Sequence, residues 1–139
     1  MIMVDSSVWI DFFNGVNKPH VEKLYQLLGK EIIVTGDLIV VEVLQGFNVD
    51  SHFNLAKEVL ERLTYFSLCD KSLALAAANN YRILRKHGIT VRKTIDVVIG
   101  TFCIENQIAL LHHNKDFVPM ENLLKLESVK YKFILPTIS

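Results

Sequence analysis

The sequence has few cysteines and no apolar run long enough to cross a membrane. Its two cysteines, Cys69 and Cys103, have no cysteine or histidine at metal-ligand spacing, which argues against a zinc motif. Both lie among apolar neighbours, so we expect buried, reduced thiols. The apolar runs 38–44 and 97–104 are shorter than the roughly 20 residues that a membrane-spanning helix needs. No basic run precedes an apolar one at the N-terminus, so we expect no signal peptide, no membrane attachment and a cytoplasmic protein.

The sequence also lacks net charge, because 15 basic residues balance 15 acidic ones. This balance argues against a protein that binds nucleic acid through net charge alone, but it allows local basic patches. One segment, residues 82–93, contains no acid. It is either an ordinary solvated helix face and loop or a surface for an anionic partner. Its basic side chains are Arg82, Arg85, Lys86, His87, Arg92 and Lys93.

What is present is enough apolar sequence for one substantial core. Half of the 139 residues are apolar, so we expect a single folded domain over residues 1–139. Short β-rich runs alternate with longer helical ones, which indicates an α/β fold with a parallel sheet covered by helices on both faces. We predict strands at 1–4, 32–35, 65–68 and 108–111, with a fifth at 132–135. We predict helices at 8–13, 18–28, 38–45, from 50 or 51 to 63, 72–86, 95–105 and 120–124.

Two acids follow predicted strands, at the edge where parallel sheets usually form their sites. Asp5 comes directly after the first strand, and Asp116 follows the fourth, close to Asn114. Each has a simpler interpretation. Asp5 could cap the next helix, as could its serine neighbours, and Asp116 could be an ordinary loop acid.

Two further acids interrupt apolar helices. Glu42 lies within residues 38–44, a helix so apolar that we expect it to be buried. An ionised carboxylate there costs several kcal/mol unless it is paired, and no lysine or arginine lies within a turn of it. Asp96 begins a helix just after Thr94. A buried ion pair for Glu42 and a favourable contact with the helix dipole for Asp96 are the alternatives to a shared site.

If these carboxylates converge, their charges repel strongly in a partly buried cleft. A divalent cation removes that repulsion, and oxygen ligands without cysteine select a hard ion such as Mg²⁺ or Mn²⁺. The chemistry that follows is metal-assisted attack of water on a phosphodiester. The sequence therefore predicts a catalytic metal site made of Asp5, Glu42, Asp96 and Asp116.

These residues, in this order, resemble the PIN-domain nucleases and, among them, the VapC-type toxins of bacterial toxin–antitoxin pairs. The resemblance is carried by VDSSVWIDFF at 4–13, VEVLQG at 41–46, KTIDVVIG at 93–100 and LLHHNKDF at 110–117. It covers nearly the whole chain. It implies a three-layer α/β/α sandwich, RNA cleavage with Mg²⁺ (or Mn²⁺ in its place), a homodimer and a small antitoxin protein as partner.

The resemblance also implies roles for neighbouring side chains. Relatives often have aspartate where this chain has Asn114, which leaves Asp116 as the fourth acid and Asn114 as a supporting ligand or phosphate contact. We therefore expect one metal ion rather than two tightly bound ones. Ser7 is expected to hydrogen-bond to the metal-binding acids, which capping does not exclude. Arg92 and Lys93 are expected to hold phosphates or antitoxin carboxylates.

Two alternatives to a ribonuclease toxin stay open at this point. The first is a PIN-like module that binds RNA or protein with weak or no catalysis, for which Asn114 is the only support. The second is another α/β enzyme or signalling domain with strand-end aspartates. Aspartyl-phosphate phosphatases need a second aspartate where this chain has Ser7, and receiver domains need paired acids after the first strand. Both therefore fit poorly.

Overall fold

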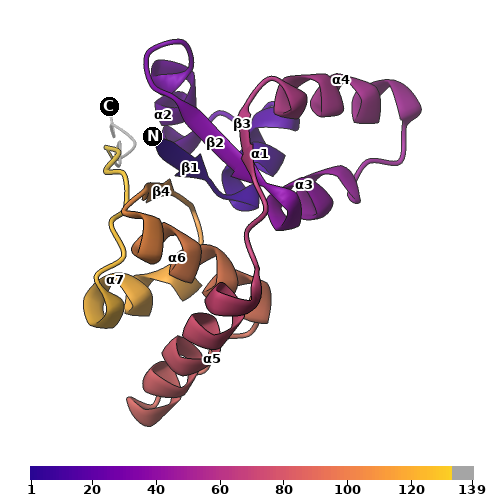
Figure 1. Cartoon of the computed structure of the whole chain (residues 1–139). Coiled ribbons are helices and arrows are strands. Elements are labelled where there is room, and N and C mark those ends of the chain that lie inside the picture. The colour runs from indigo at the N-terminus through magenta and orange to yellow at the C-terminus, as the bar shows by residue number, and fades with distance from the viewer. Residues whose placement is uncertain (133–139) are drawn as a thin grey trace.

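The fold is built on a four-stranded parallel sheet, seen in a computed structural model that describes residues 1–132 (Figure 1). The strand order is β3-β2-β1-β4, so the first strand is central and pairs in parallel with both β2 and β4. The predicted strands are confirmed to within two residues at each end. The predicted fifth strand lies outside the described residues, apart from its first position. The strands are β1 (Ile2–Val4), β2 (Ile33–Gly36), β3 (Thr64–Phe66) and β4 (Ala109–Leu111).

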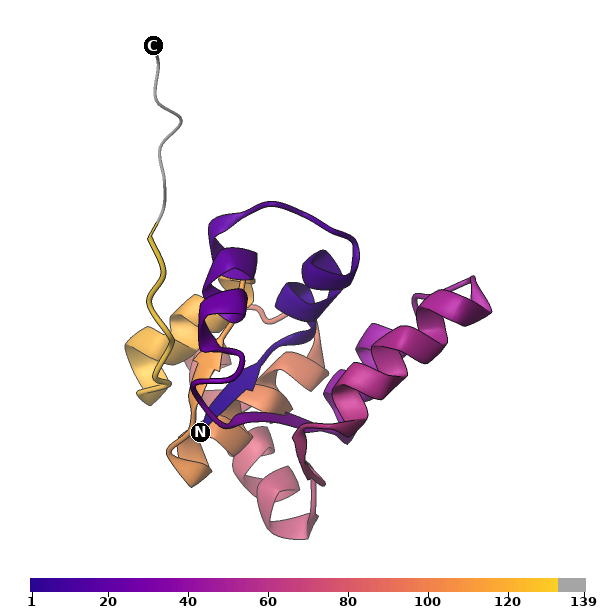
Figure 2. The same ribbon diagram turned by 90° about the horizontal axis from the view of Figure 1, so that it is seen from above.

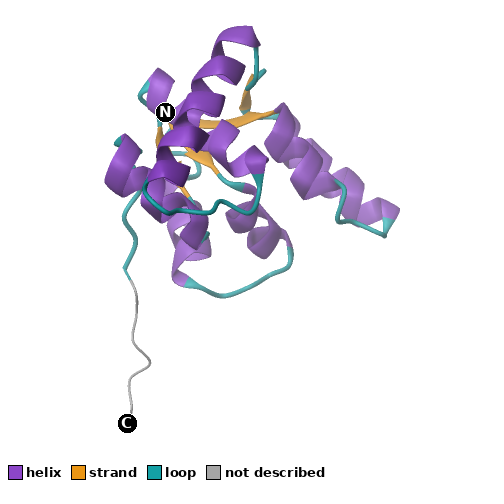
Figure 3. Cartoon of the chain, turned by 90° about the horizontal axis from the view of Figure 1, so that it is seen from below, coloured by secondary structure: helices purple, strands orange, loops and turns teal. Residues whose placement is uncertain are grey.

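Helices cover both faces of this sheet, as the α/β pattern predicted. Two helices lie on one side and three on the other, and the remaining pair extends away from one edge (Figures 1 and 2). The view from below shows the same pair projecting from the body of the molecule (Figure 3). The three-layer sandwich is therefore confirmed. The first side has α1 (Ser6–Phe13) and α2 (Pro19–Leu27), the second has α5 (Lys71–Lys86), α6 (Thr94–Asn106) and α7 (Val118–Leu124), and the projecting pair is α3 (Asp37–Leu44) and α4 (Asp50–Glu61).

Helix α6 is the most deeply buried helix of the fold, with every residue from 96 to 103 buried. Gly100 explains how neighbouring elements come so close to it. A Cβ at this position would overlap the Met120 side chain and touch Phe117, and both of those side chains are fully buried. The glycine thus lets α7 and the short 3₁₀ helix η1 (Lys115–Phe117) lie directly against α6, which fixes the start of α6 relative to the segment after β4.

The predicted starts of α2, α3, α5 and α6 differ from the structure by one residue, and those of α1 and α7 differ by two. Gly36 and Lys93, rather than Asp37 and Thr94, are the N-cap residues of α3 and α6. Asp37 does not act as the cap because its Oδ1 accepts hydrogen bonds from its neighbour Leu38 (2.9 Å) and from the Leu68 N–H (3.1 Å). The second bond ties the segment after β3 to the start of α3.

Two burial predictions were wrong. Helix α3 is not buried all round, because it lies at the edge of the sandwich and leaves Val41 56% exposed. Cys69 is exposed in the loop before α5, although Cys103 is buried as predicted. Burial raises the pKa of the Cys103 thiol to about 12. Among residues 1–132, no helix has the length and apolar character that crossing a membrane requires.

Candidate metal centre

Three acids from different elements meet at the carboxyl end of the sheet. Asp5 directly follows β1, Glu42 lies on α3 and Asp96 lies in the first turn of α6. One carboxylate oxygen from each lies within 4.8 Å of the other two. Asp5 and Asp96 are 1% and 3% exposed, and Glu42 is half-buried. The predicted convergence of these three residues is therefore present in the fold, and we call them the three-acid centre.

Asp5 caps α1, as its simpler interpretation predicted, and it also belongs to the three-acid centre. As the N-cap of α1, its Oδ2 accepts the Ser7 backbone N–H (3.1 Å) and the Ser7 hydroxyl (2.6 Å). Its own N–H donates to the Leu111 carbonyl of β4 (2.9 Å), which fixes its backbone. Its other oxygen, Oδ1, is buried and has no hydrogen-bond partner among the described residues. A buried oxygen without a partner is costly unless a ligand uses it, and a cation is such a ligand.

The three acids lie so close that the charge of one affects the pKa values of its neighbours. Burial and, to a smaller extent, the Asp5 charge raise the pKa of Asp96 to about 6, against the lowering effect of the hydrogen bond from Asn114. Burial also raises the pKa of Glu42, against the lowering effects of Ser6 and Lys93. The three-acid centre therefore resists full ionisation without an added positive charge.

Glu42 has partners that come from outside its own helix. The Ser6 hydroxyl donates to Glu42 Oε1 at 3.0 Å, and Lys93 Nζ lies 3.9 Å from Oε2. The predicted alternative of an ion pair is thus partly realised. However, the Lys93 side chain is 66% exposed, and such pairs contribute little in water. One weak pair does not balance three carboxylates.

The donor set of the three-acid centre suits a hard cation. It consists of carboxylates, and no cysteine or histidine belongs to it among the described residues. Such oxygen ligands favour Mg²⁺, Mn²⁺ or Ca²⁺ over softer metals. The residues present therefore fit a divalent ion held by Asp5, Glu42 and Asp96.

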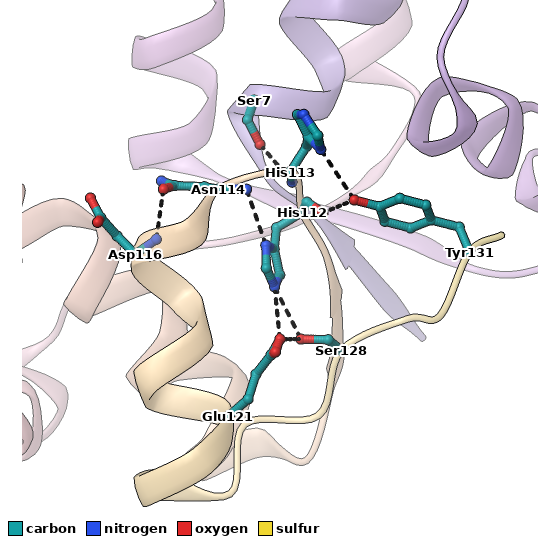
Figure 4. A network of polar contacts seen from close by, with 8 residues as sticks. All are labelled: Ser7, His112, His113, Asn114, Asp116, Glu121, Ser128 and Tyr131. Atoms are coloured by element: carbon teal, nitrogen blue, oxygen red, sulfur yellow. Dashed lines mark hydrogen bonds and ion pairs between the residues drawn. The ribbon is translucent and has the colours of Figure 1, made fainter. Parts of the chain in front are cut away.

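Asp116, the fourth predicted acid, is not part of the three-acid centre. Its Oδ2 instead accepts a hydrogen bond from Arg92 Nε at 3.1 Å. Asn114 lies between it and Asp96. The Asn114 Oδ1 accepts the Asp116 backbone N–H (3.0 Å), and its Nδ2 donates to Asp96 Oδ2 (3.1 Å), with the first of these bonds drawn in Figure 4. Because a backbone N–H needs an acceptor, the amide orientation is set, and Asn114 presents its NH₂ group to Asp96.

A polar network continues from Ser7 to the segment after β4, and Figure 4 shows its side chains without the three acids. The Ser7 hydroxyl that holds Asp5 accepts the His113 backbone N–H at 3.1 Å. His113 Nδ1 lies 3.2 Å from the Tyr131 hydroxyl, and its ring stacks on His20 with centroids 4.0 Å apart. The sequence predicted the contact of Ser7 with Asp5. It gave no signal for Ser6, His20 or Tyr131, because these contacts join distant segments.

Comparison with known proteins identifies the family to which this fold and site belong. Residues 2–122 match the PIN domain family. The chain belongs to this family. It is 25% identical over 134 residues to VapC ribonuclease Mb1587 of Mycobacterium bovis and, with the same figures, to Ribonuclease VapC11 of Mycobacterium tuberculosis. These alignments cover 95% of this chain and 100% of each relative. The resemblance to VapC-type PIN domains inferred from the sequence is confirmed.

Solved structures agree on the fold. VapBC2 from Rickettsia felis, bound to a DNA fragment from its promoter, gives a TM-score of 0.75 at 14% identity and covers 95% of this chain and 100% of that one. VapBC-1 from nontypeable Haemophilus influenzae gives 0.71 at 21% identity, with 93% and 97% covered. At such identities these likenesses establish the shared fold.

Proposed function

We propose that this chain is a single-domain, Mg²⁺-dependent endoribonuclease that acts as the toxin of a toxin–antitoxin pair. The observation that carries the proposal is the buried three-acid centre with an unpartnered Asp5 oxygen, in a PIN domain similar along its length to two proteins named as VapC ribonucleases. Mn²⁺ is expected to replace Mg²⁺, because both are hard ions of similar ligand preference. Because RNA is the substrate, we propose that the protein acts in the cytoplasm.

In this proposal Asp5, Glu42 and Asp96 hold the ion. The ion would activate water and neutralise charge on the phosphate that is cleaved. The protein's own part is to fix the carboxylates, which it does through the Ser6 and Ser7 hydroxyls. With a pKa near 6, the carboxyl of Asp96 is mostly ionised at neutral pH.

Two basic side chains beside the three-acid centre would hold the RNA backbone. Arg92 and Lys93 are 67% and 66% exposed, and each contacts an acid at or beside the centre. Both therefore have positive charge available where a phosphate would approach. The sequence assigned Asp116 to the ion and Asn114 to a supporting contact, whereas the carboxylate of Asp116 contacts Arg92.

Cleavage of RNA with and without Mg²⁺ or Mn²⁺ tests this function. Wild type should cleave with either ion and stop when EDTA removes it. Asp5→Ala should lose cleavage, whereas the matched control Asp50→Ala, at an exposed position on α4, should retain it. RNA binding by a wild type that never cleaves would refute the enzyme and favour a PIN-like binding module instead.

The proposed partners are a small antitoxin protein and a second copy of this chain. The two solved neighbours are VapBC assemblies by name. This chain also exposes large apolar side chains on its projecting helices and on α5, which are the kind of surface that partners cover. The exposed fractions are 56% for Val41, 60% for Leu55 and 66% for Leu75. Light scattering of the chain alone should give the mass of a dimer, and a monomer would refute this part.

A further inference from the structure

The Arg92–Asp116 pair lies beside the three-acid centre but outside it. Arg92 Nε donates to Asp116 Oδ2 at 3.1 Å, from a side chain that is 67% exposed to one that is 12% exposed. We infer that Asp116 is a positioning residue, which holds the Arg92 guanidinium for a phosphate of the RNA backbone, and that it is not a ligand of the metal ion. The inference rests on the proposed function and names the part that this pair plays in it.

The contacts around Asp116 argue against metal binding. Its carboxylate is not among the oxygens that gather within 4.8 Å. The side chain that connects it to the centre is Asn114, which donates its NH₂ group to Asp96 and uses its carbonyl oxygen for the Asp116 N–H. An amide NH₂ is a hydrogen-bond donor with partial positive charge, so it repels a cation. The connection between Asp96 and Asp116 is therefore unsuited to a second ion.

The contacts of Arg92 leave most of its binding capacity free. A guanidinium carries five N–H donors, and only the Nε–H has an acceptor among the described residues. The remaining donors form the planar fork that recognises phosphate. Asp116, which is largely buried, holds the Arg92 Nε, while most of the arginine side chain stays exposed to solvent.

A contribution to folding stability does not explain why Arg92 and Asp116 are paired. An ion pair with one largely exposed member usually adds little to folding free energy. Lys93, the next residue, similarly reaches Glu42 at 3.9 Å. Two consecutive cations are thus held by acids at or beside the centre, in the segment 82–93 that contains no acid of its own. This arrangement places two groups that can bind phosphate beside the three-acid centre, and Asp116 sets the position of the Arg92 guanidinium.

A double-mutant cycle tests the inference on the full chain. Arg92→Ala, Asp116→Ala and the double variant are compared with wild type for cleavage of a randomised single-stranded RNA and for binding of Mn²⁺ alone, measured by electron paramagnetic resonance. We expect each single variant to raise KM for RNA about tenfold, the size of one charge-assisted hydrogen bond, and to leave Mn²⁺ affinity unchanged. The double variant should be no worse than Arg92→Ala, because Asp116 acts through Arg92. Arg62→Ala, at an exposed position after α4, is the matched control and should behave as wild type.

Conservative variants separate positioning from damage to the fold. Asp116→Asn keeps an oxygen that accepts from Arg92 Nε, so it should recover part of the KM that Asp116→Ala loses. Arg92→Lys keeps the charge without the fork and should stay impaired. Weaker Mn²⁺ binding by Asp116→Ala, a further loss in the double variant, or an unchanged KM in Arg92→Ala would each overturn the inference. If wild type does not cleave RNA, the proposed function fails, and Mn²⁺ and RNA affinities of the same variants still decide the role of Asp116.

Discussion

Replacing Asp96 by asparagine should stabilise the ion-free protein at neutral and alkaline pH. Its carboxylate is 3% exposed and lies beside two other acids, so ionisation is unfavourable in the folded state. Asparagine is nearly the same size and carries no charge. Its carbonyl oxygen can still accept the hydrogen bond that Asn114 donates to Asp96. The substitution therefore removes repulsion while keeping the local contacts.

The magnitude follows from the pKa of Asp96. Its folded value of about 6 lies above the ordinary value of 3.8, so the folded state binds the proton more tightly than the unfolded state. Ionised Asp96 therefore costs stability, fully so above pH 6, and this cost disappears as the pH falls towards 4. The pKa difference corresponds to about 3 kcal/mol as an upper bound. We expect Asp96→Asn to gain about 1–3 kcal/mol above pH 7, roughly 3–10 °C in Tm, and nothing below pH 4.

Urea or thermal unfolding in EDTA at several pH values measures this gain. Glu127→Gln, at an exposed acid, is the matched control and should change stability little. With Mg²⁺ at a thousand times its Kd the order should reverse, because the ion then adds about 4.1 kcal/mol to wild type, more than the substitution gains in EDTA. If Asp96→Asn is less stable than wild type in EDTA at pH 8, mutual repulsion in the three-acid centre is refuted.

Three further predictions follow from other parts of the fold. Ser7→Ala should lower cleavage several-fold and weaken Mn²⁺ binding, measured as for wild type, because one oxygen of Asp5 loses its hydroxyl donor. Gly100→Ala should destabilise by about 1–3 kcal/mol in urea unfolding, since the new Cβ would overlap the buried Met120 thioether and force it to repack within the core. A maleimide should label Cys69 in the native protein and spare Cys103, as mass spectrometry would show, because only the first is exposed; equal labelling would contradict the fold.

The sequence was sufficient where local pattern and burial coincide. Asp5 after a buried strand and Asp96 at the start of an apolar helix both mark positions whose geometry the fold class already determines. A parallel sheet brings the ends of β1 and β4 together, and the Asp5 N–H bonds to Leu111 as a result. Glu42 followed because an acid in an apolar helix needs a partner.

The sequence was not sufficient where side chains meet across long separations. Ser6 reaches Glu42 from α1 and Lys93 reaches it from the N-cap of α6, and no local pattern reports such contacts. Asp116 shares its loop with Asn114, and only the hydrogen bonds show that its carboxylate faces Arg92. Cys69 has apolar neighbours in sequence, but the loop before α5 leaves it exposed in space.

The backbone around the three-acid centre explains why an ion, rather than movement, must relieve its repulsion. Asp5 is fixed by its bond to β4 and by capping α1. Asp96 belongs to α6, which is buried from residue 96 to 103 and packs closely against Met120 at Gly100. Of the described cations, Lys93 reaches the centre, at 3.9 Å from Glu42 and with most of its side chain in water. Since the fold holds Asp5 and Asp96 close together and this lysine is too weakly held to balance the acids, a divalent cation that relieves their repulsion should bind tightly and stabilise the fold.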